Sequence, residues 1–342
     1  MPVRGALGAL ILILSMPLAA CGGATSSPEA MPAEKPLVIY SGRNEEFVGP
    51  ILADLEGAAG TKVEVRYGNT AELAAQLLEE GDRTDADLFF GQDAGALGAL
   101  AKAGLLSPLE EAVTSKVLPQ YADAANLWVA TSARARVIAY NPERAPEVVD
   151  ITTLDQVLDT RYRGQVGIAP TNASFQAYVT ALRVDRGESA AREFLIRLKA
   201  VAKTYEGNSQ VLAAVNSGEI SLGLVNHYYL HQLVEEEGAA KVKAKNHYLN
   251  NPEDPGSLVN VAGVGVVKRQ TPNDAAAKAV AFMLEPSSQE YIVGANAEYP
   301  VVDGVRGPAD APAISDIKGY QVDLNQIDDL DGTLKLIQEV FS

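Results

Sequence analysis

Short apolar runs alternate along the chain with longer segments in which apolar side chains recur every three or four residues. The short runs predict buried strands, at residues 37–40, 63–67, 87–90, 127–131, 136–140, 166–169, 220–225 and 259–267. The periodic segments predict helices, and in the one that Thr70 is expected to cap, Leu73, Leu77 and Leu78 should face inward. This alternation predicts an α/β fold with helices on both faces of a sheet.

The same pattern divides the chain into two lobes, with crossovers near residues 127–140 and 259–267. We expect lobe 1 to comprise residues 37–135 with 265–310, lobe 2 to comprise residues 136–264, and a C-terminal tail, residues 311–342, to pack on the lobes. In open α/β sheets, ligands bind beyond the carboxyl ends of the strands. The candidate binding loops are therefore residues 41–45, 91–94, 170–174 and 226–229.

The N-terminus has a pattern typical of exported bacterial proteins. Arg4 precedes an apolar run, residues 6–14, that is too short to span a membrane. Leu18-Ala19-Ala20-Cys21 resembles a lipobox, which implies a signal peptide over residues 1–20 and lipidation of Cys21. Residues 21–36 are rich in small and polar residues and predict a flexible tether. The alternative is an ordinary signal peptide with an incidental cysteine.

Composition removes several classes of function. Cys21 is the single cysteine, so the chain can form neither an internal disulfide nor a site built from several thiolates. The formal net charge of −16 repels nucleic acid and anionic lipid headgroups. We therefore expect no nucleic-acid partner, membrane contact through the lipid anchor only, and a monomer.

Asn226-His227-Tyr228-Tyr229 is the most informative candidate loop. It follows an apolar strand directly, so two phenol oxygens are expected near one cleft. Ferric iron favours anionic oxygen ligands, and a trivalent cation lowers the pKa of a phenol from its usual value of about 10. The tetrapeptide also fits two tyrosines packed against the opposite lobe, or a stacking surface for a sugar or an amine.

Several segments, taken together, resemble the bacterial ferric-iron-binding proteins of ABC importers. They are residues 40–43 (Tyr-Ser-Gly-Arg), 86–90 (Ala-Asp-Leu-Phe-Phe), 134–137 (Arg-Ala-Arg-Val), 170–174 (Pro-Thr-Asn-Ala-Ser), 225–229 (Val-Asn-His-Tyr-Tyr) and 298–300 (Glu-Tyr-Pro). The resemblance covers the chain beyond the tether, and the tyrosine pair is its most specific part. It implies a two-lobed periplasmic-binding-protein fold (type II), in which each lobe is a mixed sheet flanked by helices and the ligand lies in the interlobe cleft.

The resemblance also implies a function. It implies that Tyr228 and Tyr229 bind Fe(III) through their phenolates, that a synergistic anion such as carbonate or phosphate completes the shell, and that an ABC permease and its ATPase receive the iron. The chain would then be an exported lipoprotein and not an enzyme. Adjacent tyrosines with two phenolates leave about four positions of a six-coordinate shell open.

Four positions depart from the family's pattern. Many members have His where this chain has Asn44, and some have Glu where it has Gln92; branches have Tyr at the positions of Glu45 and Phe175. Phe175 cannot ligate a metal, whereas the neutral oxygens of Asn44 and Gln92, or a carboxylate of Glu45 or Asp93, could fill the open positions.

Thr171, Asn172, Ala173 and Ser174 lie where a strand leads into a helix, and free backbone N–H groups there attract anions. In the family this loop holds the synergistic anion, and Asn226 with Arg134 or Arg43 is expected to add contacts. Simple capping of the helix by Asn172 or Ser174 is compatible with this role.

Two other functions stay open at this point. The same fold could bind another small anion or an organic solute through the tyrosines. His227 and His231 are four residues apart, a spacing that suits zinc, although no zincin motif accompanies them. A secreted zinc-dependent enzyme is therefore the alternative from another class.

Overall fold

The structure is a computed structural model that describes residues 35–271 and 273–342. The predicted signal peptide, Cys21 and nearly all of the predicted tether lie outside the described residues. Within those two ranges, no helix is long and apolar enough to cross a membrane.

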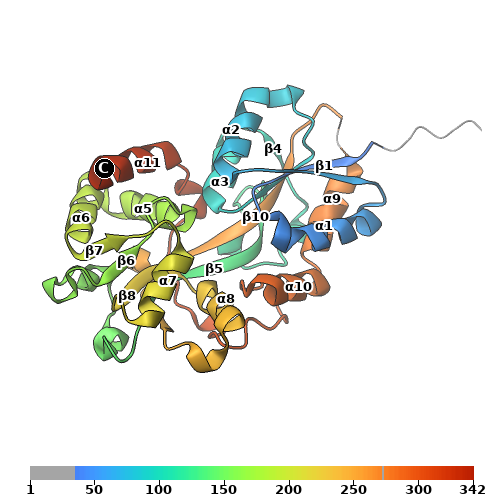
Figure 1. Cartoon of the computed structure of the whole chain (residues 1–342). Helices are drawn as coiled ribbons and strands as arrows, with labels where there is room; N and C mark the ends of the chain where they lie inside the picture. Colours follow the sequence, from blue (N-terminus) through green and yellow to red (C-terminus); the bar gives the residue numbers. More distant parts are fainter. Residues whose placement is uncertain (1–34, 272) are drawn as a thin grey trace, which may run out of the picture. The chain divides into compact units, whose positions relative to one another are not determined.

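Ten strands form one sheet that has two similar halves (Figure 1). In the first half, three strands run parallel and β10 is antiparallel to β3; β4 also pairs with β10. These strands are β1 (Leu37–Ser41), β2 (Val63–Tyr67), β3 (Leu88–Gly91), β4 (Leu106–Ser107) and β10 (Val259–Val267). The order β2-β1-β3-β10 places the switch between parallel and antiparallel pairing beside β3.

The second half repeats this arrangement. Strands β7, β6 and β8 run parallel, β5 is antiparallel to β8, and β9 also pairs with β5. Their bounds are β5 (Val129–Tyr140), β6 (Val166–Ile168), β7 (Ala202–Thr204), β8 (Leu222–Asn226) and β9 (Lys245–His247).

Strand β5 connects the two halves. Its first residues pair with β10 and its last five pair with β8. The sequence predicted two separate strands here, and this prediction was wrong because polar residues interrupt the apolar pattern at Ser132 and Arg134. Both side chains are nevertheless buried and hydrogen-bonded, so the strand continues through them for 12 residues.

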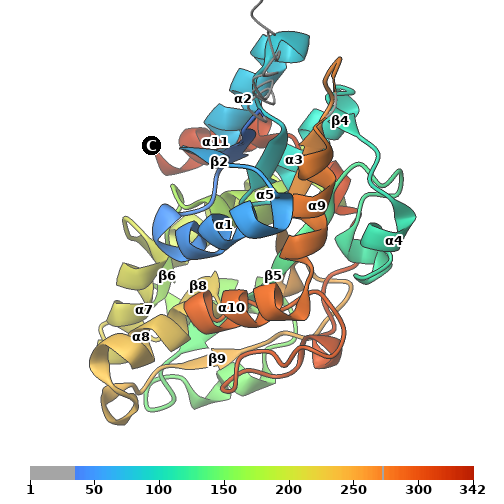
Figure 2. The ribbon, with the colours of Figure 1, turned by 90° about the vertical axis from the view of Figure 1, so that its right-hand side faces the viewer.

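Helices cover both faces of each half. In the first half, α1 (Glu45–Ala59) lies beside α9 (Asp274–Met283) and α10 (Pro286–Asn296), as Figure 2 shows, and α2 (Thr70–Glu80) packs on α3 (Ala94–Lys102). In the second half, α5 (Ala173–Arg186) packs on α6 (Glu188–Val201), and α7 (Asn208–Ser217) packs on α8 (Tyr228–Glu237). The short α4 (Glu111–Thr114) follows β4.

Two expectations for α2 need correction. Its N-cap is Asn69 and not Thr70, because the Asn69 side chain accepts the N–H groups of Ala71 and Glu72. Leu73 and Leu77 are buried as expected, but Leu78 is 47% exposed.

The C-terminal segment contacts both halves of the molecule. Leu324 and Ile327 pack into the core of the first half, and the Trp128 indole N–H donates to Asn325 at 2.7 Å. Helix α11 (Leu330–Phe341) instead packs on α5 and α6 (Figure 1). The Thr333 hydroxyl lies 2.7 Å from that of Thr180. The chain therefore passes between the halves a third time, besides β5 and β10. Trp128 is fully buried.

Candidate metal centre

The tyrosine pair lies where β8 ends and α8 begins. The N–H of His227 donates to the carbonyl of Ala135 on β5 at 3.0 Å, which fixes the turn against the neighbouring strand. The ring centroids of Tyr228 and Tyr229 are 4.5 Å apart, and the rings are tilted by 31°. Tyr228 is buried and Tyr229 is half-buried. Both side chains line one cavity of about 90 Å³.

Loops and strands from both halves meet at this cavity. The structure brings together nine of the residues that the sequence singled out: Gln92, Asp93, Arg134, Asn172, Ala173, Ser174, Asn226, Tyr228 and Tyr229. Gln92 and Asp93 follow β3, Arg134 lies on β5, and the 172–174 loop begins α5. Arg136, Leu258 and Asn260 also line the cavity, although they are not among the site residues predicted from the sequence.

Arg134 and Arg136 form a pair of guanidinium groups on one face of β5. Residues two apart on a strand point to the same side, so the Arg-x-Arg spacing within a strand is itself a sequence signal for a paired cationic site. Arg134 donates to the carbonyl of Gln92, and its buried Nε has no hydrogen-bond partner. Arg136 donates to Ser174 Oγ at 3.1 Å, to Asn226 Oδ1 at 3.3 Å and to the carbonyl of Leu224 at 3.0 Å.

Both arginines are buried without a close carboxylate. Arg134 is 4% and Arg136 6% exposed, and neither has a carboxylate within 4.0 Å among the described residues. Burial lowers the pKa of Arg136 to about 10, so the group is still charged at neutral pH. Two buried positive charges that face neutral oxygens are a costly arrangement unless an anion joins them.

The loop before α5 is largely occupied by its own hydrogen bonds. The Asn172 side chain caps the helix by accepting the N–H of Ser174 at 3.0 Å, and the Asn172 carbonyl accepts the N–H groups of Phe175 and Gln176. The side-chain amide of Asn208 donates hydrogen bonds to both Asn172 Oδ1 and Ser174 Oγ. Capping by Asn172 is thus present, and Arg134 and Arg136 are the positively charged side chains among the described residues that line the cavity.

Four of the proposed residues lie outside the cavity. Asn44 is exposed and caps α1 by accepting the N–H of Glu46, and Glu45 is exposed. Thr171 is also exposed, and its hydroxyl donates to the carbonyl of Glu206. Arg43 is paired with Glu298.

Arg43 forms a buried ion pair with Glu298. Its two terminal nitrogens lie 3.2 and 3.0 Å from the two carboxylate oxygens, and it also donates to Gln92. Asn296 and Ser132 donate to the same carboxylate. Burial alone would raise the pKa of Glu298, but Arg43, Arg134 and the Ser132 hydroxyl hold it below its ordinary value. This guanidinium is therefore already neutralised.

The cavity combines acidic and basic groups in a way that suits a cation bound together with an anion. Burial raises the pKa of Tyr228, and burial also raises that of Asp93, although the N–H of Ala96 and the charge of Arg134 act against it. Tyr228 is thus a neutral phenol until a strong cation displaces its proton. Such a cation would contact phenolate oxygens on one side, and its counter-anion would contact the two guanidinium groups.

The histidines do not form the zinc pair that their spacing allowed. His227 accepts the N–H of Ala135 at Nδ1, and its Nε2 lies 2.9 Å from the carbonyl of Ala297. Both ring nitrogens are therefore engaged, and burial lowers the pKa of His227 to about 4. His231 lies 3.6 Å from Asp310. Among the described residues, no three His, Cys, Asp or Glu side chains gather at a metal site.

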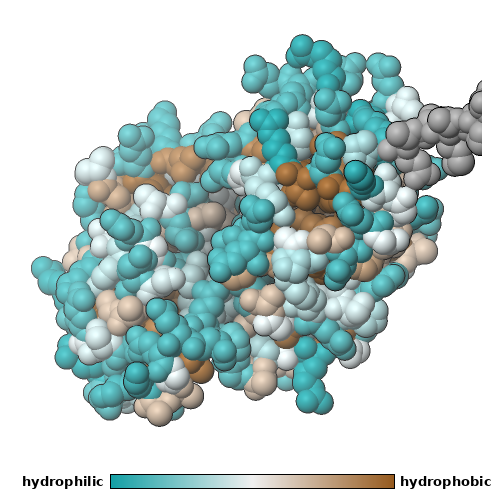
Figure 3. Space-filling model, turned by 45° about the vertical axis from the view of Figure 1, so that its right-hand side comes forward, coloured by the Kyte–Doolittle hydropathy of each residue, from teal (hydrophilic) through white to brown (hydrophobic). Residues whose placement is uncertain are grey.

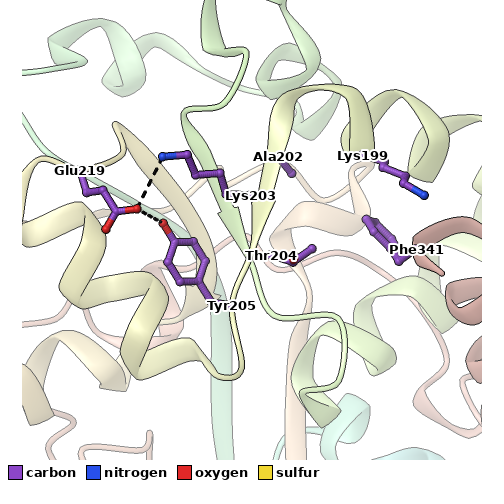
Figure 4. A pocket seen from close by; sticks show the side chains of 7 residues that line it. All are labelled: Lys199, Ala202, Lys203, Thr204, Tyr205, Glu219 and Phe341. Atoms are coloured by element: carbon purple, nitrogen blue, oxygen red, sulfur yellow. Dashed lines mark hydrogen bonds and ion pairs between the residues drawn. The ribbon is translucent and has the colours of Figure 1, made fainter.

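A separate cavity of about 500 Å³ lies at the edge strand β7 (Figure 4). Its only carboxylate, Glu219, accepts the hydroxyl of Tyr205 at 2.9 Å and lies 3.5 Å from the ammonium of Lys203. The ammonium of Lys199 donates to the carbonyl of Val340. These polar groups satisfy one another, so they offer no convergent set of ligands comparable with the tyrosine cavity.

Comparison with known proteins identifies the relatives of this chain. Residues 84–325 match the model of a family described as bacterial extracellular solute-binding protein. The major ferric iron-binding protein of Neisseria meningitidis serogroup B is 30% identical over 312 residues, which cover 91% of this chain and 94% of that protein. The Fe(3+)-binding periplasmic protein of Serratia marcescens is 30% identical over 322 residues, with 94% of each chain covered.

Solved structures agree with these relatives. Iron-bound HitA from Pseudomonas aeruginosa has a TM-score of 0.80 and 31% sequence identity, and the match covers 89% of this chain and 98% of that one. A Trichodesmium protein in complex with iron and citrate has a TM-score of 0.75 and 25% identity, covering 90% and 99%. The predicted α/β fold, with its two lobes and mixed sheets, is therefore confirmed.

Proposed function

The chain belongs to the bacterial extracellular solute-binding proteins, and to the ferric-iron-binding group among them, and we propose that it captures Fe(III) in the cavity beside Tyr228 and Tyr229. The observation that carries this proposal is the pair of phenols facing one small cavity that two buried guanidinium groups also line. Ferric iron favours anionic oxygen ligands, and the two phenols become such ligands when they lose their protons.

We also propose that a synergistic anion, carbonate or phosphate, binds between the iron and the arginines. The Nε of Arg134 has no hydrogen-bond partner. Arg136 donates to the side chains of Ser174 and Asn226, which also line the cavity. Planar guanidinium groups favour oxyanions in a bidentate geometry. The anion would occupy coordination positions that the phenolates leave open. Gln92 and Asp93 line the same cavity and are the protein groups best placed to fill the others.

Delivery to a permease completes the proposal. Lobe 1 would comprise residues 37–135 with 265–310, and lobe 2 would comprise residues 136–264. Closure of the lobes on the iron would bend β5 and β10. An ABC permease with its ATPase would recognise the closed form. The family's extracellular role supports an exported location. Lipidation at Cys21 would keep the protein at a membrane surface, as a monomer.

The test is spectroscopic. Iron loading of the purified protein should give a visible phenolate-to-iron charge-transfer band, and the double variant Tyr228→Phe with Tyr229→Phe should lose the band and the bound iron. Tyr205→Phe, which removes a surface phenol outside the cavity, is the matched control and should keep both. A wild-type protein that binds no iron and shows no band would refute the proposal.

A further inference from the structure

A larger chamber opens beside the tyrosine cavity. It has a volume of about 700 Å³, and Gln92, Asp93 and Ala173 line both spaces. The smaller space, about 90 Å³, is enough for an ion and a few ligand atoms, because one water takes about 30 Å³ in the liquid. The chamber is within the range of small-molecule sites, roughly 300–1,000 Å³. A group bound to the iron could therefore extend past these three residues into it.

The walls of the chamber are mostly aliphatic and come from both halves of the molecule. Alanines of α2, α3 and α5 line it, together with Leu78 and Ile327: they are Ala71, Ala74, Ala75, Ala96, Ala99, Ala173 and Ala177. This explains why Leu78 is 47% exposed although the sequence placed it in the core. The other exposed large apolar side chains, such as Val149 and Ile196, lie outside this chamber, and Figure 3 shows apolar surface interrupted by hydrophilic side chains.

The charges of the chamber disfavour an anionic guest. Among the described residues that line it, Arg43 is the single cation, and Glu298 neutralises it. Five acidic residues line this space: Glu45, Asp93, Asp328, Asp329 and Asp331. Lys102 pairs with Asp328, Arg183 pairs with Asp329, and the Asp93 carboxylate caps α3. The exposed carboxylates of Glu45 and Asp331 are left to attract a positive charge.

We propose that the chamber holds the organic part of a cationic ferric chelate, of the dihydroxamate class, while Tyr228 and Tyr229 complete the iron shell. The inference rests on the proposed function. Two phenolates leave about four of six positions open, and a dihydroxamate supplies four oxygen donors. Its ferric complex carries one net positive charge, since each hydroxamate contributes one negative charge. A bis-catecholate complex would carry one net negative charge, which the carboxylates oppose.

The binding step is balanced in protons and ligands. The chelate enters with two waters on its iron, and the phenol oxygens of Tyr228 and Tyr229 replace them. Two phenolic protons and two waters leave to solvent, and no redox change is required. In this complex the four hydroxamate oxygens take the coordination positions of the synergistic anion. The bound centre then carries one net negative charge, which Arg134 and Arg136 offset.

Equilibrium dialysis of the full chain, following radioactive iron and chelator separately, tests the proposal. The probes are ferric ion with carbonate, the equimolar ferric complex of rhodotorulic acid, and ferric citrate. Rhodotorulic acid is a dihydroxamate with no charged group besides its two hydroxamates. The wild type should retain iron and rhodotorulic acid together and should bind this complex more tightly than ferric citrate.

Variants that fill the chamber separate its role from iron binding. Ala75→Trp on α2 and Ala177→Trp on α5 place a large side chain at two lining positions, one from each half of the molecule. Each should weaken the rhodotorulic acid complex by about tenfold or more, because overpacking costs about 1–3 kcal/mol. Binding of iron with carbonate should not change. Glu79→Trp places the same side chain on an exposed position of α2 outside the chamber and should change neither.

Four results would overturn the proposal. A wild type that retains iron but releases rhodotorulic acid contradicts it. Unchanged binding of the rhodotorulic acid complex in both Ala75→Trp and Ala177→Trp also contradicts it. Both results leave the proposed function intact. Equal or tighter binding of ferric citrate contradicts the argument from charge. Retention of no iron with any probe would refute the proposed function and the chamber proposal together.

Discussion

Two buried arginine sites in this molecule differ in what neutralises them. Arg43 faces the carboxylate of Glu298, which also accepts from Ser132 and Asn296. Arg134 and Arg136 donate hydrogen bonds to carbonyl, amide and hydroxyl oxygens only, although they are equally buried. The charge of the first site is neutralised within the chain, although the Nε of Arg43, like that of Arg134, has no hydrogen-bond partner. The second site has no such ion pair, which is what a binding site for an external anion requires.

Removing the internal carboxylate should have the largest effect. Glu298→Ala leaves Arg43 buried and unpaired, and we expect the free energy of unfolding to fall by about 3–5 kcal/mol. Urea unfolding measures this loss. The double variant Arg43→Met with Glu298→Leu should recover most of it, since no uncompensated charge remains. A loss below about 1 kcal/mol for Glu298→Ala would show that the pair is not structurally important.

Lowering the pH should destabilise the fold through His227, a buried neutral side chain that stacks on Tyr299 next to Glu298. Its pKa is about 4 when folded and about 6.5 when unfolded, so the unfolded chain binds the extra proton between these values. Stability is therefore lost as the pH falls from about 6.5 to 4, by about 3 kcal/mol from this residue. Urea unfolding of His227→Gln across this range should show a shallower decline than the wild type. Identical slopes would contradict the prediction.

An added oxyanion should stabilise the folded protein by binding at Arg134 and Arg136, and not at Arg43, which Glu298 already neutralises. At a phosphate concentration 100 times the dissociation constant, the free energy of unfolding should rise by about 2.7 kcal/mol. Arg134→Met should abolish the gain. Arg192→Met, which breaks an exposed pair with Glu339, is the control and should retain it. Stabilisation that persists in Arg134→Met would place the anion elsewhere.

A conservative exchange should give the smallest effect. Arg134→Lys keeps the charge but loses the planar donor pair, so phosphate affinity should drop by about fivefold, or about 1 kcal/mol, while iron-free stability stays nearly unchanged. Calorimetric titration with phosphate measures this difference. An affinity equal to that of the wild type would mean that the guanidinium acts by charge alone.

The fold and the tyrosine loop could be predicted from local sequence, whereas the pairing of distant charges could not. Apolar runs revealed most strands, and the run before Asn226 located the junction that bears Tyr228 and Tyr229. Arg43 and Glu298 are 255 positions apart, so nothing in the sequence indicated that one neutralises the other. For the same reason Arg43 was assigned to the anion site and Arg136 was missed. Leu78 followed helical periodicity, which cannot distinguish a core position from the wall of a chamber.

The third passage of the chain between the halves limits how far they can separate. Ile327 is packed in one half, and Leu330 begins the helix that packs on the other. The three peptide steps between them span about 11 Å when fully extended. Opening at this point beyond that distance would require the C-terminal segment to detach from Trp128 or from Thr180. The chain's own contour length therefore sets a maximum aperture, and with it an upper bound on the size of any cargo that enters from this side.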